Sequence, residues 1–301
     1  MSILPPDVRA LYPFKRHYLE MRGPRMHYVD EGEGPAVVML HGNPTWSFFY
    51  RNLILGLRDD YRTIAPDHIG CGLSDKPQRY PYGLATHIDN LERLSDHLRL
   101  EKVTLAVHDW GGAIGFGWAI RQPQRVKRLV ILNTAAFRGP VPFRIRVCRW
   151  PVVGTAALLY LNAFARGALS MATVHPQKLT PAIRRGYLFP YQSRADRFGI
   201  LRFVQDIPIT SRSASRPVLQ SIENGLHQFR DRPAILFWGA RDFCFHDWFL
   251  DRWKTLLPSA TVHRFPDAGH YVLEDAFEEI MPRMREFLAR TAVVSPRMVA
   301  P

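Results

Sequence analysis

Short runs of apolar, mostly β-branched residues alternate with longer helical patterns along this chain, and this alternation restricts the fold more than any other feature. Strands are predicted in seven places, at residues 26–29, 36–40, 62–65, 103–107, 128–132, 234–238 and 261–265. The clearest helical periodicity lies on either side of the fourth strand, at residues 85–97 and 113–121. This order predicts the α/β class, with a mostly parallel central sheet and crossover helices.

The alternation stops between Leu132 and Ala234, where short helical patterns rich in arginine, aromatic residues and proline replace it. An inserted helical cap is the simplest explanation for this interruption. The predicted organisation therefore has three parts: core residues 1–136, cap residues 137–216 and core residues 217–301. A closing amphipathic helix is predicted at residues 277–288 and a loose tail at residues 293–301.

The chain carries 40 Lys and Arg against 27 Asp and Glu, which gives a formal net charge of +13. Most of the excess lies in residues 137–216, where twelve Arg and one Lys face only two acidic residues, Asp196 and Asp206. A basic surface often indicates an anionic partner. Because this segment has neither a contiguous Lys/Arg run nor a nucleic-acid motif, we expect a membrane or protein surface as partner and no nucleic acid.

Three cysteines, Cys71, Cys148 and Cys244, are odd in number and far apart, without metal-ligand spacing. We therefore expect a reduced, cytoplasmic protein that needs no metal and no cofactor. The uncharged, apolar stretch at residues 151–165 is shorter than the roughly 20 residues that a membrane-spanning helix needs. Residues 1–11 lack an apolar run, so no secretory signal is expected there.

The sequence VHDWGG at residues 107–112 follows an apolar strand and precedes a helix, which is the position of a nucleophile elbow. Asp109 occupies the apex, and Gly111 and Gly112 allow the helix to start close to the strand. A carboxylate is ionised at neutral pH and needs no base to become nucleophilic. We predict that Asp109 is the nucleophile. The alternative is that it only caps the helix, a common role for aspartate.

The sequence DAGH at residues 267–270 follows the last strand, where the order nucleophile, acid, histidine places a catalytic histidine. We predict that His270 is this residue and activates water. Of the two strand ends that can supply the acid, only the one after residues 234–238 offers a carboxylate, Asp242. Asp242 is therefore predicted to orient the imidazole. Asp267 is the rival acid.

The sequence HGNPTW at residues 41–46 follows a strand and lies where the second half of an oxyanion hole is expected. Backbone N–H groups of Asn43 and Trp110 are predicted to point at the same developing negative charge. The side-chain amide of Asn43 and the indole N–H of Trp110 are additional donors. The alternative for Trp110 is a packing role. The glycine-rich loop at residues 67–75 is predicted to be structural.

Aspartate in the elbow, tryptophan directly after it and asparagine after a His-Gly pair together resemble the haloalkane dehalogenase branch of the α/β-hydrolases. The chain is more similar still to the β-lactone decarboxylases of bacterial long-chain olefin biosynthesis, and this similarity extends through the cap. It is carried by HGNPTWSFFYRNL from His41, PDHIGCGLSDKP from Pro66, VHDWGGAIGFGWA from Val107, RLVILNTAAF from Arg128, LRFVQDIP from Leu201 and DAGHYVLEDA from Asp267. The resemblance implies an α/β-hydrolase fold with an inserted helical cap.

The resemblance also implies a substrate with two long alkyl chains on a four-membered lactone, which is converted to a cis-alkene and carbon dioxide. Asp109 would open the ring, and Asn43 and Trp110 would stabilise the released oxyanion or carboxylate. His270 with Asp242 would resolve the covalent adduct. The sequence leaves the point of attack open: attack at the carbonyl gives an anhydride, and attack at the ring carbon that bears oxygen gives an alkyl ester.

The apolar cap residues 152–164, with Tyr191, Phe198 and Phe203, are expected either to line a hydrocarbon channel or to pack on one another. The arginine-rich exterior of the cap has two expected partners. One is an acidic lipid surface, and the other is an assembly with enzymes of the same pathway, in particular the lactone-forming synthetase.

Three rival functions stay open. A haloalkane dehalogenase would use the same five residues with halide as the leaving group and an alcohol as product. An epoxide hydrolase would need two ring-opening tyrosines from the cap, for which Tyr160, Tyr187 and Tyr191 are available, but Asn43 argues against it. A non-catalytic receptor or scaffold usually lacks part of the triad, whereas this chain has every member.

Overall fold

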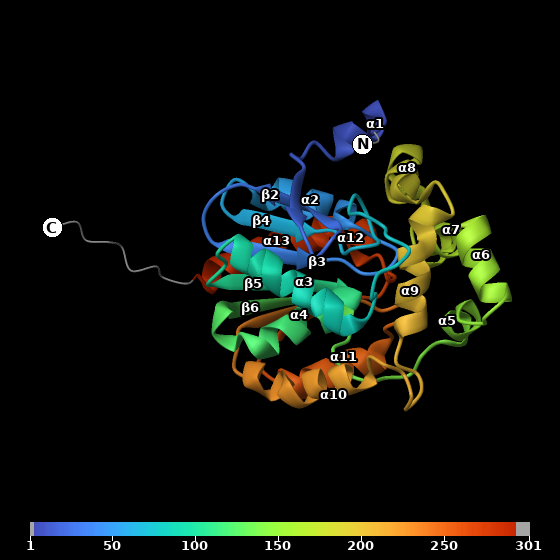
Figure 1. Ribbon diagram of the computed structural model, residues 1–301. Coiled ribbons are helices and arrows are strands. Elements are labelled where there is room, and N and C mark those ends of the chain that lie inside the picture. Colours follow the sequence, from blue (N-terminus) through green and yellow to red (C-terminus); the bar gives the residue numbers. More distant parts are fainter. Residues whose placement is uncertain (1–2, 293–301) are drawn as a thin grey trace.

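A computed structural model describes residues 3–292 of the chain (Figure 1). Its strands are β1 (His17–Glu20), β2 (Arg25–Glu31), β3 (Ala36–Leu40), β4 (Arg62–Pro66), β5 (Val103–Asp109), β6 (Val126–Thr134), β7 (Ala234–Gly239) and β8 (Thr261–Phe265). The α-helices are α1 (Pro6–Leu11), α2 (Arg51–Leu57), α3 (Leu84–His97), α4 (Trp110–Arg121), α5 (Phe143–Cys148), α6 (Val153–Leu161), α7 (Ala163–Met171), α8 (Pro181–Leu188), α9 (Phe198–Asp206), α10 (Arg216–Gly225), α11 (Asp247–Leu256), α12 (Val272–Asp275) and α13 (Phe277–Arg290).

The strands form one sheet in the order β1-β2-β4-β3-β5-β6-β7-β8. β1 pairs antiparallel with β2 and β2 with β4, whereas all other neighbouring strands run parallel. The predicted α/β fold with a mostly parallel sheet is thus confirmed. β1 was not predicted from the sequence, because the side chains of HYLE at this sheet edge are half-buried or exposed and form no apolar run.

Some predicted boundaries were wrong by a few residues. α4 begins at Trp110 and not at residue 113, because two glycines obscure the helical pattern in its first turn. β6 extends from Val126 to Thr134 and so is longer than predicted at both ends. The predicted tail at residues 293–301 lies outside the described residues.

Alternation along the strands creates two apolar layers, one on each face of the sheet. In β3, Val37 and Met39 join the cluster formed with α2 and α13, whereas Val38 and Leu40 join the cluster formed with α3, α4, α10 and α11. Side chains of a strand point alternately to opposite faces, so each face needs its own helical cover. Figure 1 shows these two groups of helices on opposite sides of the sheet.

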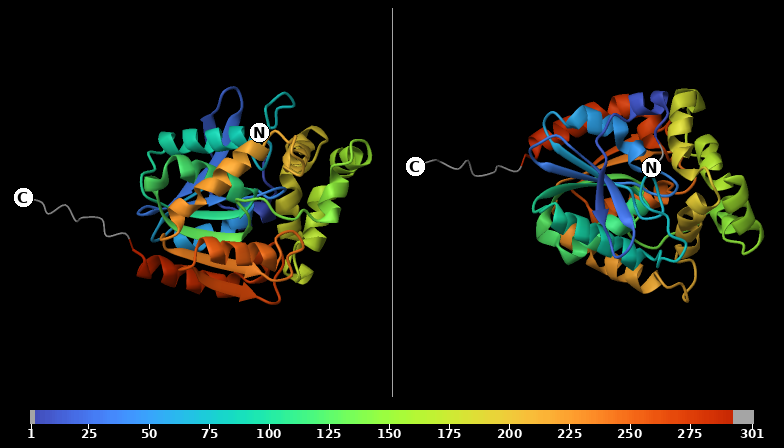
Figure 2. Two further views of the ribbon diagram at one scale, coloured as in Figure 1. Left: turned by 90° about the horizontal axis from the view of Figure 1, so that it is seen from below. Right: turned by 45° about the horizontal axis from the view of Figure 1, so that its top comes forward.

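Helices α5 to α9, residues 143–206, lie together at one end of the molecule, and we refer to them as the cap helices (Figures 1 and 2). α10, in contrast, packs on α3 and α4 of the core. None of the helices between residues 3 and 292 is long and apolar enough to cross a membrane.

A buried polar network ties the cap helices to the core. Arg51 pairs with Glu274 through two contacts of 2.5 and 2.8 Å, and the hydroxyl of Tyr187 in α8 donates to the same carboxylate. The indole of Trp46 also donates to the carbonyl of Gly186, at 3.1 Å. A hydrogen bond to a charged group contributes about 1.5–3 kcal/mol, so the contact of Tyr187 with the carboxylate of Glu274, together with the Trp46 contact, holds α8 against the core.

Candidate active site

The backbone of Asp109 makes a sharp turn between β5 and α4. Its φ of 49° and ψ of −124° are unusual for a residue with a side chain. The Thr134 hydroxyl donates to the carbonyl of Asp109, and a Cβ on Gly111 would overlap the carbonyl of Leu40. Asp109 is in the helix N-cap position, but its side chain makes no capping hydrogen bond. The carboxylate is therefore available for contacts outside the helix.

The carboxylate of Asp109 is enclosed by backbone. Its Oδ1 accepts the N–H of Asn43 at 2.7 Å, and a Cβ on Gly42 would overlap it. Burial raises the pKa of Asp109, although the charge of His270 and the backbone N–H groups of Asn43 and Trp110 oppose the rise. Only 13% of the side chain is exposed. A carboxylate with so little hydration has less solvent to shed before it attacks an electrophile.

The imidazole of His270 lies between two carboxylates. Its Nδ1 is 2.8 Å from Oδ2 of Asp242, and its Nε2 is 3.8 Å from Oδ2 of Asp109. The backbone N–H of Cys244 donates to the other oxygen of Asp242 at 2.6 Å and holds this carboxylate in place. Burial lowers the pKa of His270, but the charge and hydrogen bond of Asp242 outweigh it and raise the pKa above 6.5. The structure thus places the three predicted residues in one row: the nucleophile Asp109, then His270, then the acid Asp242.

Asp267, the rival acid, lies elsewhere. Its side chain is 66% exposed and pairs with Arg241 at 2.8 Å. The carboxylate next to His270 belongs to Asp242, which is almost fully buried. Between residues 3 and 292, no group of His, Cys, Asp and Glu side chains is arranged to hold a metal ion.

The side chains of Asn43 and Trp110 both line the same cavity as Asp109. The side-chain amide of Asn43 donates to the carbonyl of Ile200 in α9 at 3.2 Å, so part of its donor capacity is used by the cap. Its Oδ1 accepts no hydrogen bond from the described residues. The ring of Trp110 packs edge-to-face on Phe203, also in α9, at 5.4 Å. Two contacts with one cap helix therefore position both candidate donors.

Sequence reasoning missed three residues that support this row. The Thr134 hydroxyl holds the carbonyl of Asp109, His108 Nε2 lies 2.9 Å from the carbonyl of His270, and Asp275 accepts the N–H of Gly269 at 2.8 Å. The strand end at Thr134 offers a hydroxyl and no carboxylate. A hydroxyl at the carboxyl end of the strand next to the nucleophile is the signal that would have revealed this residue.

A cavity of about 510 Å³ lies between the core and the cap helices and contains Asp109 and His270 in its wall. Most of the remaining wall is apolar, and much of it comes from the cap helices. The apolar lining residues of α5, α6 and α7 are Ile145, Val147, Val153, Ala157, Leu158, Ala163, Phe164, Ala168 and Met171. The cavity therefore combines one reactive polar end with walls that suit hydrocarbon.

The two alternatives expected for the apolar cap residues, lining a channel or packing, apply to different residues. Much of the segment 152–164 lines the cavity, whereas Tyr191, Phe198 and Phe203 do not. Phe203 stacks on the ring of His87 at 4.4 Å. The Tyr191 hydroxyl accepts the N–H of Gly72 at 3.2 Å. These aromatic residues join the cap to the core, a role that composition cannot distinguish from lining.

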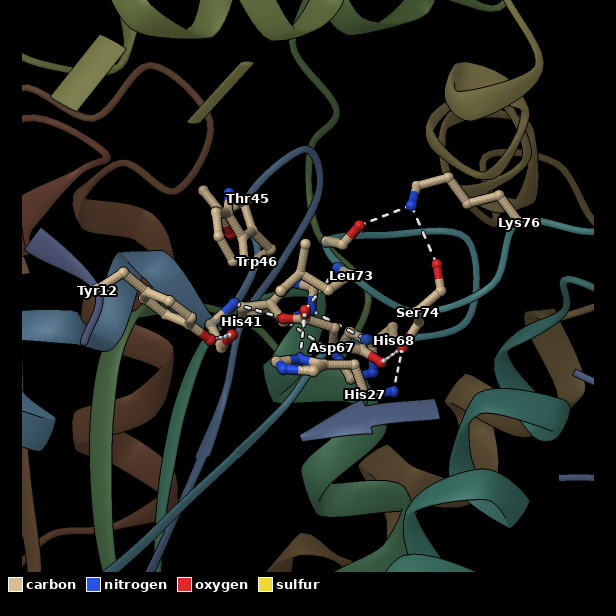
Figure 3. Close-up of polar contacts among 12 residues, drawn as sticks. Tyr12, His27, His41, Thr45, Trp46, Asp67, His68, Leu73, Ser74 and Lys76 are labelled. Atoms are coloured by element: carbon tan, nitrogen blue, oxygen red, sulfur yellow. Dashed lines mark hydrogen bonds and ion pairs between the residues drawn. The ribbon is translucent and has the colours of Figure 1, made fainter. Parts of the chain in front are cut away.

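The loop at residues 67–75 contains a second buried carboxylate, outside the cavity. Asp67 accepts the backbone N–H groups of Ser47 and Leu73, both at 2.7 Å, and lies 2.9 Å from Nδ1 of His27 (Figure 3). Burial raises the pKa of Asp67, but the charges of neighbouring histidines, the hydrogen bond to His27 and the N–H of Leu73 together outweigh it, so the pKa is lowered. These contacts suit a structural role for the loop.

Comparison with known proteins identifies the family of this chain. The family model described as alpha/beta hydrolase fold matches residues 35–277. The chain belongs to the α/β-hydrolase family. Within it, this α/β-hydrolase is 45% identical to two proteins named cis-3-alkyl-4-alkyloxetan-2-one decarboxylase. The one from Shewanella oneidensis aligns over 96% of this chain and 93% of the relative, and the one from Xanthomonas campestris over 93% and 97%.

Haloalkane dehalogenases are more distant relatives of this α/β-hydrolase. Haloalkane dehalogenase 2 of Mycobacterium bovis is 32% identical over 90% of this chain and 93% of the relative. The crystal structure of a haloalkane dehalogenase loop variant from Bradyrhizobium elkanii superposes with a TM-score of 0.82 at 27% identity, covering 92% of this chain and 97% of the other. Both resemblances expected from the motifs are thus confirmed.

Proposed function

We propose that this α/β-hydrolase converts cis-3-alkyl-4-alkyloxetan-2-ones into cis-alkenes and carbon dioxide, with Asp109 as the nucleophile. The observation that carries the proposal is the carboxylate of Asp109, which lies in the wall of an apolar cavity 3.8 Å from His270. The names of the two relatives that are 45% identical support this reaction and substrate class.

In the first step, Asp109 attacks the ring carbon that bears the ring oxygen. A bond forms between a carboxylate oxygen and this carbon, the carbon–oxygen bond of the ring breaks with inversion, and strain in the ring is released. The product is an alkyl ester of Asp109 with a free carboxylate on the neighbouring carbon. Covalent catalysis of this kind divides one difficult reaction into two easier steps.

In the second step, the bond to the free carboxylate breaks and carbon dioxide leaves. The electron pair forms the carbon–carbon double bond, and the ester bond breaks to return the carboxylate of Asp109. Inversion followed by anti fragmentation converts a cis-lactone into a cis-alkene, and no water is consumed. Attack at the carbonyl would instead leave an alkoxide on the other carbon, which is a poor leaving group. We therefore favour the ester route.

His270 acts in the second step of this mechanism. Its raised pKa favours the imidazolium form, and Nε2 lies 3.8 Å from the oxygen of Asp109 that regains negative charge. Asp242 holds the ring and compensates its charge. This assignment differs from water activation, which a hydrolytic reaction would require.

Asn43 and Trp110 stabilise negative charge on the substrate. Their backbone N–H groups act on the carboxylate of Asp109 in this structure. Once Asp109 is bonded to carbon, these donors and the indole N–H of Trp110 are free to bind the carboxylate released from the ring. Removal of one such donor typically costs about 3–4 kcal/mol of transition-state stabilisation.

We also propose the domain division predicted from the sequence, with residues 137–216 as the cap between core residues 1–136 and 217–301. The contacts of α10 with α3 and α4 support the second boundary, because this helix starts at Arg216 and packs on the core. We further propose that the enzyme is cytoplasmic and works in bacterial olefin biosynthesis, close to the enzyme that forms its lactone.

A single comparison of two substrates tests the proposed function. The enzyme is given a synthetic cis-β-lactone with two long alkyl chains, and alkene is measured by gas chromatography; in parallel, bromide release from a bromoalkane is measured. We expect alkene, and its absence together with bromide release would overturn the proposal. Hydrolytic halide release is the second candidate function, supported by the TM-score of 0.82 to a haloalkane dehalogenase.

A further inference from the structure

The segment 143–171, which holds helices α5, α6 and α7 and their connections, exposes an unusual number of large apolar side chains. Seven such residues are between 44% and 79% exposed: Phe143, Trp150, Val152, Val153, Tyr160, Leu161 and Met171. Elsewhere among the described residues, only Ile3 and Trp248 are comparable. Exposed apolar side chains that gather in one region usually mark an interaction surface. We call residues 143–171 the outer cap face.

The outer cap face is also basic. It contains Arg144, Arg146, Arg149 and Arg166 and not a single Asp or Glu. Within residues 3–292, none of the four forms an ion pair; Arg146 donates to a backbone carbonyl and Arg144 contacts a methionine sulfur, whereas Arg149 donates to the carbonyl of Ile207 and is influenced by the charge of Asp206. Arg144, Arg146 and Arg166, which lie among exposed apolar side chains, suit a lipid surface with anionic headgroups above an apolar interior.

The outer cap face lies at the edge of the molecule and at the cavity. Figures 1 and 2 show α5, α6 and α7 on the far side of the cap from the sheet. Val153 is 62% exposed and also lines the cavity, as do Arg144, Arg146 and Met171. The cavity therefore reaches the surface at this face, so a ligand that enters there passes between the exposed apolar side chains.

We propose that the outer cap face docks onto an anionic lipid bilayer. Trp150, Val152 and Leu161 enter the boundary between headgroups and acyl chains, and the arginines bind lipid phosphates. In this orientation the cavity opens toward the bilayer, and an apolar substrate dissolved there enters without crossing water. The lack of any acidic residue on the face favours lipid over a protein partner, which would need an apolar and acidic surface of its own.

The test is co-sedimentation of the full-length protein with phosphatidylcholine vesicles, prepared with and without phosphatidylglycerol. We expect binding to the anionic vesicles, little binding to the neutral ones, and release by salt. Binding to neutral and anionic vesicles alike, or no effect of salt, would overturn the electrostatic part of the proposal. No binding to either would overturn it entirely and leave an acidic protein surface as the occupant.

Matched variants locate the docking face. The triple variant Arg144→Gln, Arg146→Gln, Arg166→Gln is expected to bind anionic vesicles about tenfold more weakly or worse. The control variant removes the same charge from exposed positions on the core: Arg22→Gln, Arg93→Gln, Lys102→Gln. It is expected to bind as the unmodified protein does, and equal loss in both variants would contradict the assignment of the face.

The apolar contribution is tested separately, with Trp150→Ser and Leu161→Ser. Both side chains are more than half exposed, so folding should be unaffected, and thermal unfolding verifies this. We expect both variants to bind anionic vesicles more weakly than the unmodified protein at the same salt concentration. Unchanged binding would mean that charge alone holds the protein on the vesicle and would contradict insertion of these side chains. These measurements use no substrate, and Asp109→Asn should bind vesicles normally, so failure here is distinct from failure of the proposed function.

Discussion

Asp67 and Asp109 occupy comparable places in the sheet but have opposite surroundings. Asp67 follows β4 and Asp109 ends β5, and these are the two parallel neighbours of β3. The carboxylate of Asp67 is fully buried, and that of Asp109 is 13% exposed. The first accepts two backbone N–H groups and contacts an imidazole at 2.9 Å. The second also accepts a backbone N–H, from Asn43 at 2.7 Å, but its nearest imidazole is 3.8 Å away and it lies in a cavity wall.

The electrostatic consequence follows from these contacts. Burial raises the pKa of both carboxylates, but at Asp67 the contacts with His27, the charge of His41 and the N–H of Leu73 together lower the pKa, whereas at Asp109 burial dominates and the pKa is raised. Ionisation of Asp67 therefore stabilises the fold at neutral pH, and ionisation of Asp109 opposes it. The paired carboxylate of Asp67 therefore stabilises the fold, whereas the carboxylate of Asp109, with fewer partners and a cavity beside it, can attack a substrate.

Asp109→Asn should have the largest effect on function. The amide has the same shape but is not a nucleophile, so we expect alkene formation to fall by at least about 10³-fold. The thermal unfolding temperature should not decrease, because a disfavoured buried charge is removed. Gas chromatography and a thermal melt measure the two quantities. Substantial turnover by the pure variant would contradict the role of Asp109.

Asp67→Asn should lower the stability of the protein and leave the turnover of the folded enzyme largely unchanged. Removing one partner of a buried, hydrogen-bonded pair is expected to lower the free energy of unfolding by about 3 kcal/mol. Stability from Asp67 is present above its unfolded pKa near 3.8 and is lost as pH falls through the lowered folded value, so the difference from the unmodified protein should shrink in acid. Denaturant unfolding at neutral and acidic pH measures it. Turnover of the remaining folded enzyme should persist.

Trp110→Phe tests whether the indole N–H of Trp110 contributes to the reaction at Asp109. It removes the indole N–H but keeps an aromatic ring against Phe203, which contacts Trp110 at 5.4 Å. We expect about a 10²-fold loss in kcat for the lactone with little change in stability. Trp118→Phe, in the buried core, is the matched control and should act mainly on stability. Equal kinetic loss in both variants would assign Trp110 to packing alone.

The pH profile should show the smallest but most diagnostic effect. Alkene formation should fall in acid as Asp109 protonates, at a pKa raised above 3.8, and fall again in alkali as His270 loses its proton, at a pKa raised above 6.5. Asp242→Asn should move the alkaline limb to lower pH by about one unit or more. Asp267→Asn, which changes the exposed rival acid, should leave it unmoved. An alkaline limb that does not respond to Asp242→Asn would contradict the imidazolium assignment.

The fold and the reactive row were largely predictable from sequence because both depend on local patterns. Apolar runs that alternate with helices define the sheet, and an aspartate between an apolar strand and two glycines defines the elbow. The structure was needed to place Asp242 and not Asp267 beside His270, since both follow strands at the same edge of the sheet. It was also needed for Phe203, which packs on Trp110 and His87 instead of lining the cavity.

The most direct test of the account is the covalent bond between Asp109 and substrate. His270→Ala is incubated with a cis-β-lactone, digested and analysed by mass spectrometry. Loss of the imidazole should slow the second step more than the first, so the peptide that contains Asp109 should gain the mass of the intact lactone. Alkene production with no adduct on that peptide, or an adduct on another residue, would contradict the claim that this carboxylate is the nucleophile.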